Sequence, residues 1–111
     1  MNPYYEPDKL GLEMLAFDEP DLCYAYNKLC FWATPDGQVY TASDSGCSCP
    51  VPFENHDRAT AEEVMQTLER VGSVEQAEAT FDAWVKGQTT PSFGADERRR
   101  LTEWMCAKLK V

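Results

Sequence analysis

The sequence predicts an α+β fold, with an N-terminal antiparallel β-meander of about three strands followed by about three α-helices. In the first half, apolar and aromatic residues cluster without the helical period of about 3.6 residues. In the second half, helix-start and helix-stop residues bracket apolar positions at helical spacing. The chain has 111 residues, of which 43% are hydrophobic, so we expect a single domain over residues 1–111 with a strand half (1–57) and a helical half (58–111).

Three segments of the first half are expected to form strands. Apolar residues are nearly continuous from Leu12 to Phe17, and the run from Leu22 to Ala33 is rich in aromatic residues. The third segment, from Gln38 to Ser43, alternates in character. Between the last two segments, Thr34-Pro35-Asp36-Gly37 has the composition of a type I turn, which predicts a hairpin. After Ser43 the residues become Gly, Ser, Cys and Pro, which favours a connecting loop.

The first helix is expected from Ala61 to Val71. Thr60 and Glu63 have the spacing of a capping box, in which the two residues satisfy free N–H groups at the start of a helix. Gly72 stands where a left-handed residue would end the helix.

Two more helices follow. Ser73 and Gln76 repeat the capping box with Gly87 as the stop, and Asp96 is the expected cap of the last helix. Periodicity across the whole chain predicts a core that includes Leu29, Phe31, Val39, Val64, Leu68, Phe81, Trp84, Leu101 and Trp104.

Negative charge is concentrated in the strand half. Residues 1–57 hold ten acids against Lys9 and Lys28, whereas residues 58–111 hold nine acids against eight bases. Such a field repels nucleic acids and anionic membranes and attracts basic protein surfaces. The acids that we expect to contact a basic partner are Asp18, Glu19, Asp21, Asp36, Asp44 and Glu54. The alternative is that the charge only keeps the protein soluble.

The sequence gives no sign of export or membrane insertion. It holds no apolar run of about 18 residues, and its N-terminus lacks a basic region followed by an apolar one. Five cysteines without repeated spacing argue against a disulfide framework, so reduced thiols in a cytoplasm are expected.

The segment from Ser43 to Pro50 is the densest group of polar side chains. One interpretation is a structural turn built from Asp44, Ser45, Gly46, Cys47 and Cys49, with Gly46 at positive φ. A second is a zinc site of Cys47, Cys49 and His56, completed by Asp44 or Cys23, although a lone C-x-C is short of ligands. A third is a catalytic Cys/His pair, for which no orienting group is evident. We favour the turn, with neither metal nor cofactor and no catalytic residue.

The stretch from Tyr40 to Glu54, YTASDSGCSCPVPFE, carries a resemblance. Together with the strand from Tyr24 to Trp32 and with Tyr5-Glu6-Pro7, it resembles a family of small uncharacterised proteins encoded by actinobacterial phages. The resemblance covers roughly residues 4–57. It implies a phage product that works in the cytoplasm of a bacterial host, and it transfers neither an activity nor a site residue.

From these observations we expect a non-catalytic binding protein that engages a basic surface of a bacterial host protein, as an inhibitor or a nucleic-acid mimic. The alternative is a small metal-binding or thiol-dependent protein centred on Cys47, Cys49 and His56. Direct binding to nucleic acid or membrane is not expected, and the oligomeric state is left open.

Overall fold

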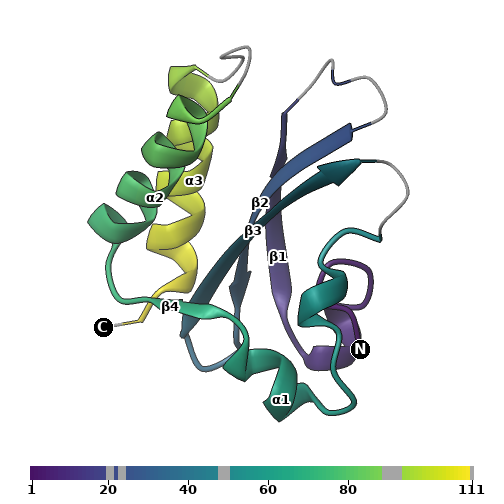
Figure 1. The fold of residues 1–111 in the computed structure, drawn as a ribbon. Helices are drawn as coiled ribbons and strands as arrows, with labels where there is room; N and C mark the ends of the chain where they lie inside the picture. Colours follow the sequence, from purple (N-terminus) through teal and green to yellow (C-terminus); the bar gives the residue numbers. More distant parts are fainter. Residues whose placement is uncertain (20–21, 23–24, 48–50, 89–93, 111) are drawn as a thin grey trace.

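A four-stranded antiparallel sheet forms the centre of the chain, in the strand order β1-β2-β3-β4. The computed structural model describes residues 1–19, 22, 25–47, 51–88 and 94–110. The strands are β1 (Glu13–Asp18), β2 (Ala25–Ala33), β3 (Val39–Cys47) and β4 (Glu69–Val71). The helices are α1 (Ala61–Gln66), α2 (Val74–Lys86) and α3 (Ala95–Lys108), with short 3₁₀ turns η1 (Asp8–Leu10) and η2 (Glu54–His56). The predicted α+β class, a meander followed by helices, is confirmed (Figure 1).

The predicted hairpin joins β2 to β3. Thr34 N–H donates to the carbonyl of Gln38 at 2.9 Å, and Gly37 N–H donates to that of Thr34 at 3.1 Å. Gly37 adopts φ 91°, the left-handed conformation that glycine enters at little cost.

Helices α2 and α3 cover one face of the sheet, as Figure 1 shows. Alternate residues of β2, namely Leu29, Phe31 and Ala33, face these helices. The remaining members of this core are Leu15, Phe17, Val39, Val71, Ala77, Phe81, Leu101 and Met105. Arg98 of α3 pairs with Glu78 and Asp82 of α2, which ties the two helices together.

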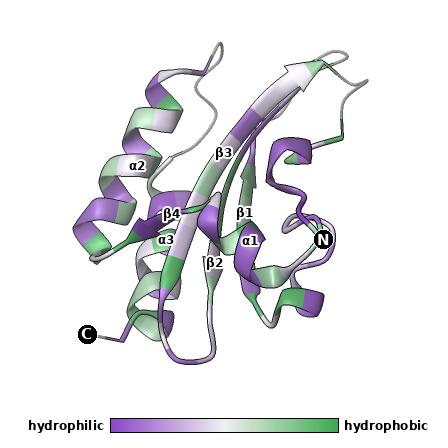
Figure 2. Cartoon of the chain, turned by 60° about the horizontal axis from the view of Figure 1, so that its bottom comes forward, coloured by the Kyte–Doolittle hydropathy of each residue, from purple (hydrophilic) through white to green (hydrophobic). Residues whose placement is uncertain are grey.

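The opposite face is covered by the N-terminal segment, η2 and the residues that follow α1. Its core consists of Leu12, Cys30, Trp32, Phe53 and Leu68. Strand β2 is therefore buried on both faces, which explains why its second half is continuously apolar. Figure 2 shows that β3 begins hydrophobic and becomes hydrophilic in its second half.

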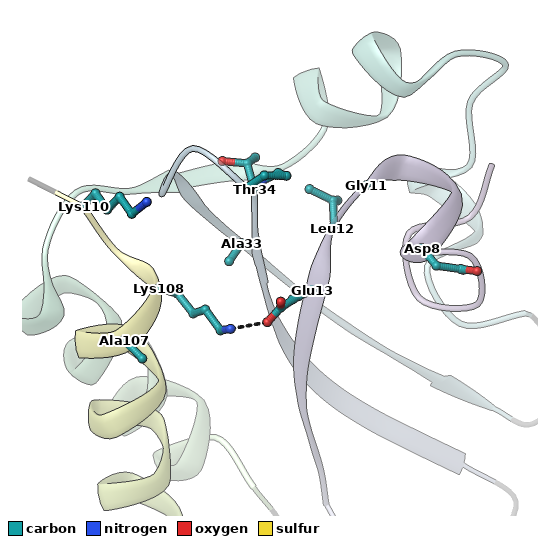
Figure 3. Close-up of a pocket in the computed structure, with 10 residues that line it drawn as sticks. Asp8, Gly11, Leu12, Glu13, Ala33, Thr34, Ala107, Lys108 and Lys110 are labelled. Atoms are coloured by element: carbon teal, nitrogen blue, oxygen red, sulfur yellow. Dashed lines mark ion pairs between the residues drawn. The ribbon is translucent and has the colours of Figure 1, made fainter.

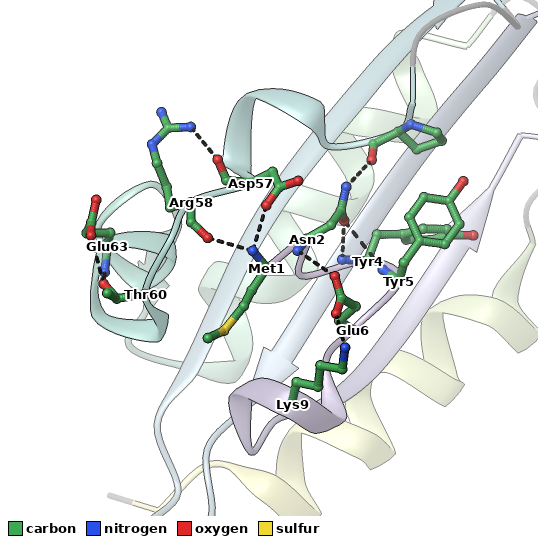
Figure 4. A network of polar contacts seen from close by, with 11 residues as sticks. Met1, Asn2, Tyr4, Tyr5, Glu6, Lys9, Asp57, Arg58, Thr60 and Glu63 are labelled. Atoms are coloured by element: carbon green, nitrogen blue, oxygen red, sulfur yellow. Dashed lines mark hydrogen bonds and ion pairs between the residues drawn. The ribbon is translucent and has the colours of Figure 1, made fainter.

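Asn2 anchors the N-terminal segment (Figure 4). Its side-chain amide donates to the carbonyl of Pro52 at 2.9 Å, and its Oδ1 accepts from the N–H groups of Tyr4 and Tyr5. The side chain of Asn2 bonds backbone on both segments, so residues 1–6 and 51–53 form one layer.

The helical half differs from the prediction between Thr67 and Val71. The first helix ends at Gln66, and Glu69–Val71 pair with β3 as a fourth strand instead of continuing the helix. The hydroxyl of Thr67 donates to the carbonyl of Val64 at 2.6 Å, which ends the helix locally. Val71 lies opposite Val39, so pairing buries it in the sheet core.

The caps are confirmed at two helices and differ at the third. Thr60 and Ser73 accept from the N–H groups three residues on, as expected. At α3 the cap is Gly94, whose N–H donates to the carboxylate of Glu97, and Asp96 lies in the first turn.

Most of the predicted core is buried. Leu29, Phe31, Val39, Val64, Leu68, Phe81 and Leu101 are buried, while Trp84 and Trp104 are half-buried. The predicted stop at Gly87 is confirmed, because α2 ends at Lys86 with Gly87 as its C-cap. Gly72 is not a helix stop and does not have positive φ, since α1 already ends at Gln66.

Candidate functional site

A row of three charges crosses the sheet. Asp18 of β1, Lys28 of β2 and Asp44 of β3 are neighbours in register. The Lys28 ammonium pairs with Asp18 and donates to the hydroxyl of Tyr4 at 3.0 Å. Burial opposes this charge, but the hydrogen bonds to Asp18 and Tyr4 outweigh it and raise the pKa of Lys28 above its ordinary value. The single cation of the row is thus held in place by its partners.

Asp44 links the sheet to η2. Its Oδ2 accepts from the N–H of Phe53 at 2.7 Å and from the hydroxyl of Tyr26 at 3.1 Å. Phe53 has φ 61°, and among the described residues it is the only non-glycine residue with positive φ. Its side chain is fully buried, so Asp44 helps to hold a strained residue that supports the second core.

The residues expected to form a turn continue strand β3 instead. Asp44, Ser45, Gly46 and Cys47 pair with residues 25–28 of β2, and Cys49 lies outside the described residues. Gly46 does not have positive φ. A Cβ there would lie 3.2 Å from the hydroxyl of Tyr26, so the glycine leaves room for the tyrosine ring. The backbone of residues 44–47 is therefore satisfied by strand pairing, and among these four residues only Asp44 makes the expected side-chain-to-backbone bond.

Four of the six candidate acids lie at one end of the sheet. Asp18 and Asp44 share the charged row, and Glu19 follows Asp18. Glu54 is exposed in η2, directly after Phe53. Partial burial raises the pKa of Tyr26, and its bond to Asp44 and the charges of Asp44 and Glu54 raise it further. We call Asp18, Glu19, Asp44 and Glu54 the acidic strand end.

The other two candidates are not part of this group. Asp36 is exposed in the β2–β3 turn, at the opposite end of the strands. Asp21 lies outside the described residues.

Glu19 differs from its expected role because it is 7% exposed. Its Oε1 accepts from the side-chain amide of Asn27 at 2.9 Å, and Asn27 Oδ1 accepts from the indole N–H of Trp84 at 2.9 Å. These residues line a cavity of about 440 Å³. The sequence does not predict this cavity; its one signal is Asn27, an uncharged polar residue on the strand face that otherwise carries Ala25, Leu29, Phe31 and Ala33.

Cys47 and His56 do not come together, and the other two candidate cysteines, Cys23 and Cys49, lie outside the described residues. Cys47 is exposed and shares a face of β3 with Ser45 and Ser43, the face on which α2 and α3 pack. His56 lies beside the ring of Phe53 on the opposite face of the sheet. Among the described residues, no three His, Cys, Asp or Glu side chains are grouped as metal ligands would be. Burial raises the pKa of the Cys30 thiol to about 12, so that thiol is unreactive.

His56 has a defined tautomer. Its Nδ1 lies 2.9 Å from Oγ1 of Thr67, whose proton goes to the carbonyl of Val64. Nδ1 must therefore carry the hydrogen and donate it. Burial lowers the pKa of His56, and the charge of Asp44 offsets this only in part.

We expect His56 to make the protein less stable in mild acid. The unfolded chain takes up a proton near pH 6.5, whereas the folded chain resists it, so the free energy of unfolding falls as the pH drops through that value. Denaturant unfolding between about pH 7.5 and pH 5.5 should show a steeper loss for the wild type than for His56→Asn, which keeps an N–H donor for Thr67 but does not titrate. Identical slopes would contradict this role.

A second cavity, of about 410 Å³, lies between the start of β1, the end of β2 and the end of α3 (Figure 3). Two of its lining residues carry opposite charges and form an ion pair, the ammonium of Lys108 with the carboxylate of Glu13. This arrangement fastens α3 to the sheet.

Comparison with known proteins gives a family and no function. A family model described as a domain of unknown function, DUF7574, matches residues 1–104. No curated protein and no solved structure matches the chain. Within the described residues, no helix is both long enough and apolar enough to cross a membrane.

Proposed function

We propose a function for this chain, which belongs to the DUF7574 family: it is a non-catalytic protein of phage origin that works in the cytoplasm of a bacterial host. There it binds a basic surface of a host protein through the acidic strand end. An inhibitor that occupies a nucleic-acid-binding groove is one form of this activity, because carboxylates on a rigid sheet can stand in for phosphates.

The observation that carries the proposal is the gathering of candidate acids at one end of the sheet. The layers that cover the two faces of the sheet also differ in charge. Segments 1–12 and 51–67 hold six acids against two bases, whereas α2 and α3 together hold six acids against five bases. A cationic surface is therefore attracted to the acidic strand end and the layer beside it more strongly than to the helices.

The test is charge reversal at exposed positions. Asp18 and Glu54 are the suitable pair, because Glu19 is buried and Asp44 bonds to the backbone. A partner captured from an actinobacterial host lysate is purified, and its association rate is measured by stopped-flow. The Asp18→Lys, Glu54→Lys variant should associate at least about tenfold more slowly at low salt and keep nearly the same stability.

A matched control carries the same change in net charge elsewhere. Asp36→Lys with Glu69→Lys alters exposed acids in the β2–β3 turn and in β4. This control should slow association much less, and raising the salt severalfold should slow the wild type more than the Asp18, Glu54 variant. Equal slowing by both variants would contradict the location, and indifference to charge and salt would show that the acids only confer solubility.

A further inference from the structure

The cavity beside the acidic strand end is lined by a residue with a buried oxygen that no described residue bonds. It is lined by Glu19, Asn27 and Trp84 together with Leu22, Ala25, Tyr26, Ser45, Gly46, Ala83 and Gly87. We call it the strand-end cavity. It lies between the ends of β2 and β3 and the last turn of α2.

One oxygen of Glu19 is satisfied and the other is not. Oε1 accepts from Asn27, whereas the buried Oε2 has no hydrogen-bond partner among the described residues. Gln88 follows the lining residue Gly87 and is 7% exposed, and within the described part of the chain neither its Nε2 nor its Oε1 is bonded. Buried polar atoms normally find partners, because an unmet carboxylate oxygen costs free energy. An unmet carboxylate oxygen on a residue that lines the cavity indicates that a ligand completes its bonding.

The missing group is a hydrogen-bond donor with positive charge. A carboxylate accepts only. Among the described residues, the one side-chain donor to Glu19 is Asn27, whose own Oδ1 accepts from Trp84. Lys28, the one cation of the charged row, is paired with Asp18. It therefore does not neutralise the negative charge of Glu19 at the cavity. An anion would meet the Glu19 carboxylate without a compensating charge.

The lining selects a flat cation. Trp84 of α2 lines the wall, and a guanidinium both stacks on an aromatic ring and presents several N–H groups in one plane. An ammonium is more strongly hydrated and stacks less well.

We propose that the strand-end cavity takes the guanidinium of an arginine side chain from the basic partner. The guanidinium donates to Oε2 of Glu19 and lies against Trp84. This inference rests on the proposed function for the identity of its occupant, because a surface attracted to the acidic strand end presents arginine beside the cavity.

The first experiment uses N-acetyl-arginine amide as the probe and NMR of the whole chain. Millimolar probe should shift the indole N–H of Trp84 and the side-chain amide of Asn27, and N-acetyl-lysine amide should bind severalfold more weakly. Glu19→Gln, which keeps the shape and removes the charge, should weaken arginine-amide binding about tenfold or more. Glu103→Gln, an exposed change on α3, should leave it unchanged.

A second pair of variants covers the case in which Glu19→Gln does not fold. Ala83 lines the cavity and is exposed on α2, and Ala79 is exposed one turn earlier without lining it. Ala83→Leu should block the probe, whereas Ala79→Leu should not. Absence of shifts at Trp84 and Asn27, or equal binding by both leucine variants, would overturn the proposal. Because the probe needs no partner, its binding can succeed while partner capture fails, and the reverse also holds.

Discussion

Replacing Trp32 with alanine is expected to lower the free energy of unfolding by about 3–5 kcal/mol. Trp32 is 0% exposed in the second core, its indole N–H donates to the carbonyl of Pro3 at 2.8 Å, and its ring meets that of Phe53 edge to face. The substitution opens a cavity and leaves the Pro3 carbonyl unmet. Since a typical domain is stable by about 5–15 kcal/mol, this is a large share of the total. Chemical denaturation measures the loss.

Two further variants give stability losses with which that of Trp32→Ala can be compared. Trp104→Ala removes a half-buried indole from α3 and should cost clearly less. Trp32→Phe keeps most of the volume and loses the N–H, so it should fall between the two and remains measurable if the alanine variant does not fold. If Trp32→Ala cost no more than Trp104→Ala, the layer of residues 1–12 and 51–67 would contribute little to stability.

Replacing Asp44 with alanine is expected to cost about 1–3 kcal/mol, because it removes the acceptor from a backbone N–H. That N–H belongs to Phe53, which would have to keep φ 61° without support. Urea unfolding of Asp44→Ala against Ser45→Ala, an exposed change on the same strand, isolates the effect.

Asp44→Asn separates the hydrogen bond from the charge. It retains a carbonyl acceptor for Phe53, so it should recover part of the stability that alanine loses. Equal losses for asparagine and alanine would mean that the negative charge matters and the bond to Phe53 does not.

The class, the hairpin and most of the core could be predicted from local signals. The turn around Gly37 has residues that suit one conformation, and the caps Thr60 and Ser73 act within three residues of themselves. The fourth strand could not be predicted in this way. Leu68 and Val71 fit a helical period, and only the pairing of Val71 with Val39, over 30 residues away, makes them part of a sheet edge.

The candidate site was predicted in part for a similar reason. Charge along the chain indicated Asp18, Asp44 and Glu54. The register of the strands brings Asp18 and Asp44 into one row, and the bond from Phe53 to Asp44 brings Glu54 near them. Composition cannot show that Glu19 is buried, nor that Asn27 and Trp84, 57 residues apart, share a hydrogen bond. The residue types of the Ser43–Pro50 segment suit a turn, whereas pairing with the facing strand β2 makes residues 43–47 part of the sheet.

Because the strands lie in the sheet in the order in which they occur in the chain, each strand can meet its neighbour as the ribosome releases it. The helices that cover Leu15, Phe17, Leu29 and Phe31 come last, at residues 74–108. During synthesis, the paired sheet would therefore expose one apolar face to solvent until α3 has left the exit tunnel. A nascent chain stalled before residue 95 should accordingly bind holdase chaperones, and release of the full chain should end that binding.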